Sequence, residues 1–336
     1  MAEYNWRKER EKYRPDFMKQ PEPEQPSVPQ PPQNRRSYAG VIVAVIAVVV
    51  IVVAAVVFAV SRKTAGSGDS AVMLAQAAER YKNAVGLVVL TVELQDGSKI
   101  PLPIGTAWAF APEKFATNAH VALSLREANL KLRQKLAAAK KPVRSVEAQI
   151  IVNGRQRQIL SVTHVQLHKD YGIADTSRDP DVAALTVEKK HDSCFKIAPQ
   201  SVLHGLKSGE PIAFLGFPME NLRGGNVNTD NPVASMQSGI IVAVSDFDMK
   251  DAGGSGNVLI RHNLPSTGGA SGSPIFNRNG AVVGLLHAIN VVGQVKPGKS
   301  GVTVERAPSG AQINFAIRAD LLAGIGSPVP IQEFLK

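Results

Sequence analysis

The central part of the chain consists of short apolar runs that end, every few residues, at Gly, Pro, Asn or Asp. Runs of this length, rich in Val, Ile and Leu, are typical of β-strands, and the residues between them are typical of turns. The runs are Val85–Val92, Ile104–Phe110, Ala148–Val152, Ile159–Leu167, Val182–Val187, Pro211–Leu215, Gly239–Val244, Val258–Arg261, Ala281–Ile289 and Gln312–Ile317. Many short strands without alternating helices predict an all-β fold, a sandwich or barrels.

Two segments interrupt this pattern with helical features. Ala71–Lys82 indicates a helix that leads into the first strand. Further along, Ser124 and Glu127 have the spacing of a capping box, and Pro142 ends the pattern that follows. The apolar stripe of this second helix is formed by Leu125, Ala128, Leu132 and Leu136. We therefore predict a helical insertion over residues 124–141.

Most of the formal net charge of +10 lies in one patch, which covers this insertion and the residues just after it. Residues 126–144 hold seven Lys or Arg against one Glu, a net charge of +6. Aromatic residues that could stack on bases do not alternate with these charges, so we expect no nucleic-acid partner. The helix 124–141 is instead a candidate contact for an acidic partner or for lipid headgroups.

The N-terminal part of the chain differs in composition from the rest. Residues 1–37 are charged and rich in proline, so we expect a disordered tail. Ala39–Val60 is a run of 22 residues without a charge, which as a helix spans a hydrocarbon core of about 30 Å. A cleaved signal peptide is disfavoured, because the run is too long and follows a 37-residue leader. We predict a single transmembrane helix over residues 38–61 and a linker over 62–71.

The charges around the predicted membrane helix indicate its orientation. Eight Lys or Arg precede it and few follow closely, which favours a cytoplasmic N-terminus. The rest of the chain would then be extracytoplasmic, in a periplasm or at the cell surface. Cys194 is the only cysteine, so an intrachain disulfide is excluded.

A candidate nucleophile lies in the segment Thr267–Pro274, where Ser271 stands among small residues. Glycines on both sides allow a tight turn that exposes the serine hydroxyl and directs backbone N–H groups at one point. A plain Gly-Ser loop has the same composition, so a catalytic role requires partner residues elsewhere in the chain.

Two upstream segments contain candidate partners for this serine. His120 ends one strand pattern and Asp181 opens another, although such residues are commonly structural or turn residues. Rival acids close to Asp181 in the sequence are Asp170, Asp175 and Asp179. Three segments resemble, in this order, the three signatures of trypsin-like serine peptidases: Ala116–His120, Asp181–Leu185 and Gly269–Pro274. The bacterial HtrA-type branch is the most similar. The resemblance covers residues 72–320 and implies two six-stranded antiparallel β-barrels, over residues 72–200 and 201–336.

The resemblance also implies roles for individual residues. His120 would be the general base, Asp181 would orient it, and Ser271 would attack the substrate carbonyl. The backbone N–H groups of Gly269 and Ser271 would form the oxyanion hole. The implied activity is that of a membrane-anchored serine endopeptidase that cleaves proteins or peptides through an acyl-enzyme. No cofactor or metal is needed, and no PDZ domain is expected after the second barrel.

One departure from the family pattern keeps a second reading open. Ala270 precedes the candidate nucleophile where relatives of this family have Asp or Asn. A side chain that would hold the loop is missing, so the oxyanion hole is expected to be loose at rest. The alternative function is therefore a catalytically idle protease fold that acts as a binding or scaffold protein at the membrane.

Few residues in the sequence indicate a substrate pocket, and none indicates a metal site. Leu286 is expected in the pocket wall and Pro265 near its base, and without an acid there we predict a preference for a medium apolar side chain. His287 follows the wall position and should face away from the pocket, because side chains alternate along a strand. His164 and His168 are four residues apart in a strand pattern, which does not indicate a metal site.

Overall fold

A computed structural model describes residues 69–154, 157–173, 179–219, 228–288, 291–298, 301–308 and 313–336. The predicted tail 1–37, the predicted membrane helix 38–61 and most of the linker 62–71 lie outside these residues. Within the described part of the chain, no helix is both long enough and apolar enough to cross a membrane. The described part begins with a helix over residues 69–81, in agreement with the helix predicted there.

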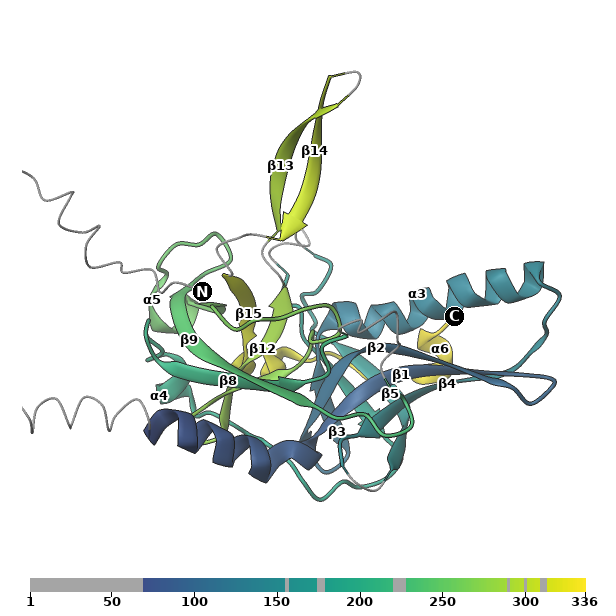
Figure 1. Cartoon of the computed structure of the whole chain (residues 1–336). Helices are drawn as coiled ribbons and strands as arrows, with labels where there is room; N and C mark the ends of the chain where they lie inside the picture. Colours follow the sequence, from purple (N-terminus) through teal and green to yellow (C-terminus); the bar gives the residue numbers. More distant parts are fainter. Residues whose placement is uncertain are drawn as a thin grey trace, which may run out of the picture. The chain divides into compact units, whose positions relative to one another are not determined.

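The first half of the described chain closes into an antiparallel β-barrel. Its strands are β1 (Val85–Leu94), β2 (Lys99–Ala111), β3 (Lys114–Thr117), β4 (Val143–Val152), β5 (Gln158–Leu167) and β6 (Ala183–Val187). They pair in the order β1-β2-β3-β6-β5-β4, and β4 pairs back with β1. This N-terminal barrel confirms the six-stranded prediction (Figure 1).

The second half closes into another antiparallel barrel. Its strands are β8 (Pro211–Gly216), β9 (Ser235–Ser245), β10 (Leu259–His262), β11 (Pro274–Asn277), β12 (Ala281–Ala288) and β15 (Asn314–Arg318). They pair in the order β8-β9-β10-β15-β12-β11, and β11 pairs back with β8. The short strand β7 (Lys196–Ile197) runs parallel to β12 at its edge. The C-terminal barrel therefore also has the predicted six strands.

A two-stranded ribbon, which the sequence pattern did not predict, lies between β12 and β15 in the chain. It consists of β13 (Val291–Gly298) and β14 (Gly301–Pro308), which among the described strands pair only with each other (Figure 1). The remaining short elements are η2 (Lys82–Ala84), α4 (Gln200–Leu203), α5 (Gly253–Gly256), η3 (Ala319–Gly324), β16 (Val329–Pro330) and α6 (Ile331–Phe334).

The sequence of strand β1 is apolar without alternation because both of its faces are buried. Val88, Leu90 and Val92 face the interior of the N-terminal barrel. Leu87 and Val89, on the opposite face, join a second core that also contains residues of the C-terminal barrel, such as Leu215, Phe276 and Leu285. Both faces of β1 are thus buried, one inside its barrel and one between the two barrels.

Helix α3 (Ala119–Ala138) begins earlier than the insertion 124–141 predicted from the sequence. Its N-cap is Asn118, so the predicted capping box is wrong: Ser124 lies inside the helix, where its Oγ donates to the carbonyl of His120. A helix-interior serine commonly bonds back to the carbonyl four residues earlier, which imitates a cap in the sequence. The helix packs along β1, β2 and β4 (Figure 1), and His120 is its second residue.

The predicted domain 201–336 places the end of the chain with the C-terminal barrel, but the structure places it with the N-terminal barrel. Strand β16 pairs with β5 of the N-terminal barrel, and Ile331 and Leu335 enter the core of that barrel. Asn129 of α3 donates through Nδ2 to the carbonyl of Leu335 at 2.9 Å. The apolar residues of this last segment are therefore buried in the core of the N-terminal barrel.

Candidate active site

His120 and Asp181 are brought together by the pairing of β3 with β6. Thr117, the last residue of β3, lies opposite Ala183, the first residue of β6. His120 follows Thr117 by three residues and Asp181 precedes Ala183 by two, so both reach the same edge of the N-terminal barrel. Asn118 fixes this arrangement, because its Nδ2 donates to the carbonyl of Asp181 at 2.8 Å.

Two contacts join the histidine to the carboxylate. The backbone N–H of His120 donates to Oδ1 of Asp181 at 2.8 Å, and Nδ1 of His120 lies 2.5 Å from Oδ2. The side chain of Asp181 is 2 % exposed and that of His120 is 40 % exposed. The acid is therefore buried behind an imidazole whose other edge remains accessible.

The hydrogen bonds to Asp181 keep it ionised. Burial acts to raise the pKa of this carboxyl, but the hydrogen bonds and charges of His120 and His287 outweigh it and hold the pKa well below its ordinary value. An ionised carboxylate can only accept hydrogen bonds, so Nδ1 of each histidine carries the proton. The lone pair of the neutral His120 ring is then on Nε2, the nitrogen that a general base needs.

His287 is a second imidazole on the same carboxylate. It comes from β12 of the C-terminal barrel, and its Nδ1 lies 2.6 Å from Oδ2 of Asp181. The strand pattern predicts that this residue faces away from the substrate pocket, but it does not indicate a partner for the side chain.

Ser271 lies on a tight turn before β11. Gly269 and Gly272 have φ of +87° and +85°, a region that glycine adopts without strain. A Cβ on Gly272 would lie 2.2 Å from the carbonyl oxygen of Thr106, so this close approach also requires glycine. The hydroxyl of Ser271 makes a long contact of 3.5 Å to the carbonyl of His287, and between the described Ser271 and His120 side chains there is no hydrogen bond.

The backbone N–H groups of Gly269 and Ser271 have no hydrogen-bond partner among the described residues. Unpaired backbone donors are uncommon in loops that pack closely against other segments. Two such donors beside a serine hydroxyl provide the groups that an oxyanion hole requires.

Thr106 of β2 holds this turn from the opposite barrel. Its backbone N–H donates to the carbonyl of Ser271 at 3.0 Å, and its Oγ1 donates to the carbonyl of Gly269 at 2.9 Å. The same Oγ1 accepts from the backbone N–H of Phe217 at 3.0 Å. Thr106 is fully buried, so these bonds are shielded from water.

Ala270 changes the expectation of a loose loop. Its side chain is fully buried in the core of the C-terminal barrel, and its backbone N–H bonds to the carbonyl of Thr267 at 3.2 Å. Together with the bonds from Thr106, this packing supports the turn without an acidic side chain at position 270.

The rival acids do not reach His120. Asp170 is exposed and lies 3.7 Å from Nδ1 of His168, and Asp179 is buried and accepts from the backbone N–H of Gly172. Asp175 lies outside the described residues. Of the three rivals, the two that are described thus pair with other groups.

His120, Asp181 and His287 offer a metal ion one ligand atom each, all within 4.8 Å. Tetrahedral ligands at normal zinc distances stand about 3.3 Å apart. The two Nδ1 atoms lie only 2.5 and 2.6 Å from the carboxylate oxygen, which is hydrogen-bond distance. The observed spacing therefore fits protons between these atoms, and a zinc ion would have to push them apart.

The predicted pocket residues lie in different environments. Leu286 is 1 % exposed and packs in the core of the C-terminal barrel, so a substrate could reach its side chain only if that core opened. Pro265 is exposed. The assignment of both residues to a substrate pocket stays a prediction.

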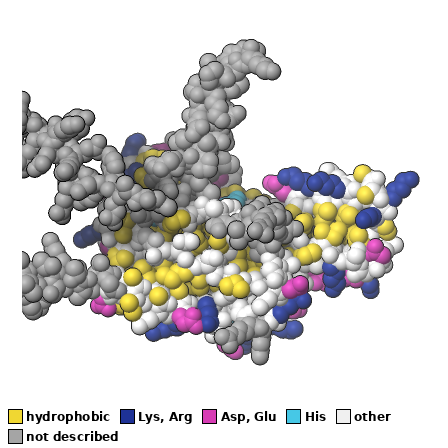
Figure 2. Space-filling view, in the orientation of Figure 1, with side chains coloured by type: hydrophobic (Ala, Val, Ile, Leu, Met, Phe, Trp, Pro, Cys, Tyr) yellow, Lys and Arg dark blue, Asp and Glu magenta, His cyan; other side chains and the backbone are white. Residues whose placement is uncertain are grey.

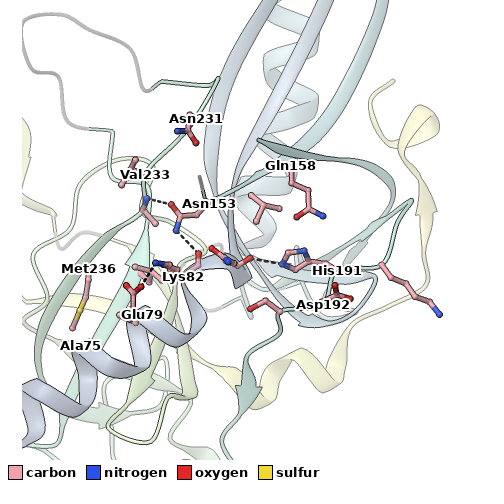
Figure 3. Close-up of a pocket in the computed structure, with 18 residues that line it drawn as sticks. Ala75, Glu79, Lys82, Asn153, Gln158, His191, Asp192, Asn231, Val233 and Met236 are labelled. Atoms are coloured by element: carbon pink, nitrogen blue, oxygen red, sulfur yellow. Dashed lines mark hydrogen bonds and ion pairs between the residues drawn. The ribbon is translucent and has the colours of Figure 1, made fainter. Parts of the chain in front are cut away.

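A pocket of about 960 Å³ is lined by residues of the first helix, by the end of β4 and by the segment around His191 (Figure 3). Its lining includes none of His120, Asp181 and Ser271. Asn153 crosses it, donating to the carbonyl of Lys82 at 2.8 Å and accepting from the N–H of Ala234 at 2.9 Å. The predicted catalytic residues therefore lie outside this pocket.

The chain belongs to the trypsin-like peptidase family, because the model of the trypsin-like peptidase domain matches residues 105–285, more than half of the chain. Among solved structures, the HtrA-type protease AlgW with a decapeptide is similar at 17% identity and a TM-score of 0.45, over 74% of this chain and 65% of that one. Deg5 is similar at 14% identity and a TM-score of 0.42, over 75% of this chain and 90% of that one. The chain thus spans slightly less than two thirds of the AlgW chain. A search of curated proteins gave no match.

Sequence reasoning missed the functions of two residues in this site. Thr106 lies in the predicted strand Ile104–Phe110, but a threonine in a strand gives no signal of a bond to a loop 163 residues away. His287 was noticed only for the pocket. Its partner could have been sought from the period-two alternation, which turns the neighbour of a core residue, Leu286, toward the other face of β12.

Proposed function

We propose that the chain is a serine endopeptidase in which His120, Asp181 and Ser271 form the catalytic triad. The observation that carries this proposal is the buried Asp181 carboxylate on Nδ1 of His120, which leaves Nε2 as the free base. The free N–H groups of Gly269 and Ser271 add the second requirement, a site for a negative oxygen.

The reaction follows from these groups. Nε2 of His120 takes the proton of the Ser271 hydroxyl as Oγ attacks the substrate carbonyl carbon. The carbonyl oxygen becomes negative and accepts hydrogen bonds from Gly269 and Ser271, while Asp181 stabilises the imidazolium. His120 then gives its proton to the leaving amine, which produces an acyl-enzyme. His120 then takes a proton from water, and the water oxygen attacks the acyl carbon. His120 returns the proton to Oγ of Ser271, which releases the carboxylic acid product.

One movement is needed before attack. The Ser271 hydroxyl contacts the carbonyl of His287 at 3.5 Å and must rotate toward Nε2 of His120. Catalytic hydrogen bonds are often long without substrate and tighten when it binds, so this geometry agrees with the proposal.

Hydrolysis of an unfolded protein tests the proposal. The wild-type chain should cleave unfolded casein, and Ser271→Ala should lower the rate by about 10⁴-fold or more. Ser273→Ala is the matched control, since Ser273 stands two residues away with a buried hydroxyl that bonds to no described group. Equal cleavage by wild type and Ser271→Ala would refute the assigned nucleophile.

The second candidate function is that of a binding or scaffold protein with an idle protease fold. It is favoured by the Ser271 hydroxyl, which bonds toward His287 and not toward His120. Binding of unfolded casein without cleavage, equal in wild type and Ser271→Ala, would support this candidate and contradict the first.

We further propose that residues 38–61 anchor the peptidase as a single membrane helix, with the N-terminus cytoplasmic and residues 72–336 extracytoplasmic. The 22-residue uncharged run supports the anchor, and the eight basic residues before it support the orientation. Protease added outside intact cells should cut the catalytic part while leaving a tag at residue 1 intact. Cleavage of the tag alone would indicate the opposite orientation, with the N-terminus outside.

The basic helix remains a candidate contact for an acidic partner or lipid headgroups. Lys and Arg side chains gather over the outer part of α3 (Figure 2). Binding of vesicles that contain anionic lipid should fall steeply as salt rises.

A test with peptide substrates should show preference for a medium apolar residue before the cleaved bond, and preference for Glu or Arg would overturn that expectation.

A further inference from the structure

Asp181 receives two imidazoles on one oxygen, one from each barrel. Its Oδ2 lies 2.5 Å from Nδ1 of His120 and 2.6 Å from Nδ1 of His287. We propose that His287 is a titratable positioning residue of the triad, which ties the carboxylate to the C-terminal barrel and competes with His120 for its negative charge. This inference rests on the proposed peptidase function.

The two rings meet only at the carboxylate. Their centroids are 6.0 Å apart and their planes are inclined by 65°, so they do not stack. The side chain of His287 is 23 % exposed and that of Asp181 is 2 % exposed. The carboxylate is therefore fixed between the barrels by one donor from β12 and two donors from His120.

This geometry limits the protons that the site can hold. When both rings are neutral, each gives its Nδ1–H to Oδ2 and keeps a lone pair on Nε2. A proton added to either ring creates one cation, which the single negative charge of Asp181 balances. A second cation would lack a counter-charge, so protonation of His287 opposes protonation of His120.

The neighbouring groups described next are not expected to exchange protons together with His120 and His287. Burial, followed by the charges of Asp181 and Asp179, raises the pKa of the Tyr171 phenol, so this side chain stays neutral. Asp179 is buried and accepts from the N–H of Gly172. On the strands beside this end of β12, the paired residues are not titratable: Pro274, Ala316 and Phe315.

Two substitutions separate holding from titration. His287→Asn places an amide N–H near the position of Nδ1, so it keeps a donor but cannot be protonated. His287→Ala removes both the donor and the charge. His164→Asn is the matched control, because His164 is a part-buried histidine on β5 whose Nδ1 contacts Thr163 and not the triad.

The pH profile of kcat/KM on a peptide substrate gives the first readout. At pH 8 we expect about a threefold loss in His287→Asn and about a 10²-fold loss in His287→Ala, whose carboxylate is no longer held. The acid limb should move to higher pH, by about half a unit in His287→Asn and about one unit in His287→Ala. The direction follows because removing a competitor leaves more of the negative charge of Asp181 to stabilise protonated His120. His164→Asn should leave the acid limb in place.

A second readout does not depend on activity. In Ser271→Ala protein, the NMR titration midpoint of the His120 ring should move in the same order, from wild type at position 287 through Asn to Ala. If the midpoints move but no background cleaves peptides, the peptidase proposal fails and the coupling of the two histidines stands. If activity falls while neither the acid limb nor the His120 midpoint moves, His287 is merely structural and the inference is overturned.

Discussion

The two barrels contribute to the site in different ways. The N-terminal barrel supplies His120 and Asp181 from paired strands, with a buried carboxylate and short hydrogen bonds. The C-terminal barrel supplies Ser271 from a glycine turn, where the hydroxyl makes one long contact and two backbone donors stay free. In the proposed mechanism, the acid–base half is thus set before substrate binds, whereas the nucleophile half keeps the freedom that attack requires.

Each barrel also sends one residue into the half that the other barrel supplies. Thr106, from the N-terminal barrel, bonds to the carbonyls of Gly269 and Ser271 in the nucleophile turn. His287, from the C-terminal barrel, bonds to the carboxylate of Asp181. These contacts hold the two halves of the site together across the barrels. The side-chain bonds of Thr106 to Gly269 and of His287 to Asp181 can each be removed by a single substitution, whereas the backbone bond of Thr106 to Ser271 remains.

The largest effect is expected from Asp181→Asn in the acid–base half. An amide in place of the carboxylate can donate to Nδ1 of His120 and so stabilise the wrong tautomer, with the proton on Nε2. We expect kcat to fall by about 10⁴-fold, measured with a fluorogenic peptide at pH 8. A loss below tenfold would show that the N-terminal half does not set the base.

The nucleophile half is tested by Thr106→Val, which has nearly the same shape but no hydroxyl. The substitution removes the bond to the carbonyl of Gly269 and leaves the N–H of Phe217 without its acceptor. We expect about a 10²-fold fall in kcat, because the oxyanion donors lose their alignment.

Thr106→Ser serves as the control for that experiment, since it keeps Oγ and should recover most of the rate. If Thr106→Val lowers the melting temperature but leaves kcat unchanged, Thr106 stabilises the barrel contact without aligning the turn.

The stability of the C-terminal barrel should depend on pH through His262. Burial, opposed in part by a backbone contact at Phe315, lowers the pKa of His262 to about 4. The unfolded chain therefore takes up a proton at higher pH than the folded chain, so stability is full above about pH 6.5 and falls toward pH 4. We expect this group to account for a loss of about 2 kcal/mol between pH 7 and pH 5, measured by urea unfolding.

In His262→Asn the same comparison should lose most of that pH dependence, although the protein will be less stable at pH 7. His164→Asn, in the N-terminal barrel, should keep the wild-type slope. An unchanged slope in His262→Asn would contradict the assignment.

The smallest effect concerns helix α3, which ties the end of the chain to the N-terminal barrel. Asn129→Ala removes the buried bond to the carbonyl of Leu335 and should cost about 1–2 kcal/mol of unfolding free energy. The exposed pair Lys131–Glu127 offers the control, and Lys131→Ala should change stability by about 0.5 kcal/mol or less. Equal effects of the two substitutions would show that the chain end is not held there.

The sequence supports the prediction of elements better than that of contacts between them. Short apolar runs and turn residues identify the strands, because burial and turn geometry leave a local signature. The start of α3 was misplaced, since Ser124 and Glu127 imitate a cap inside the helix. The return of Val329–Pro330 to the N-terminal barrel is a pairing between distant segments, which local patterns do not record.

The same division applies to the site. His120, Asp181 and Ser271 stand in short segments that resemble a family, so each could be proposed from its neighbours. Thr106 and His287 act across the barrels, at sequence separations of 163 and 106 residues. Their partners depend on how two closed sheets face each other, and that arrangement becomes visible only in three dimensions.

In the proposed mechanism, the N-terminal half activates the serine of the C-terminal half. Labelling with a fluorophosphonate probe, located by mass spectrometry, tests it directly in wild type, His120→Ala and Ser271→Ala. We predict labelling of wild type at Ser271 alone, at a rate that falls by about 10³-fold or more in His120→Ala. Labelling of Ser271 at the same rate in His120→Ala, or no labelling of folded wild type, would contradict it.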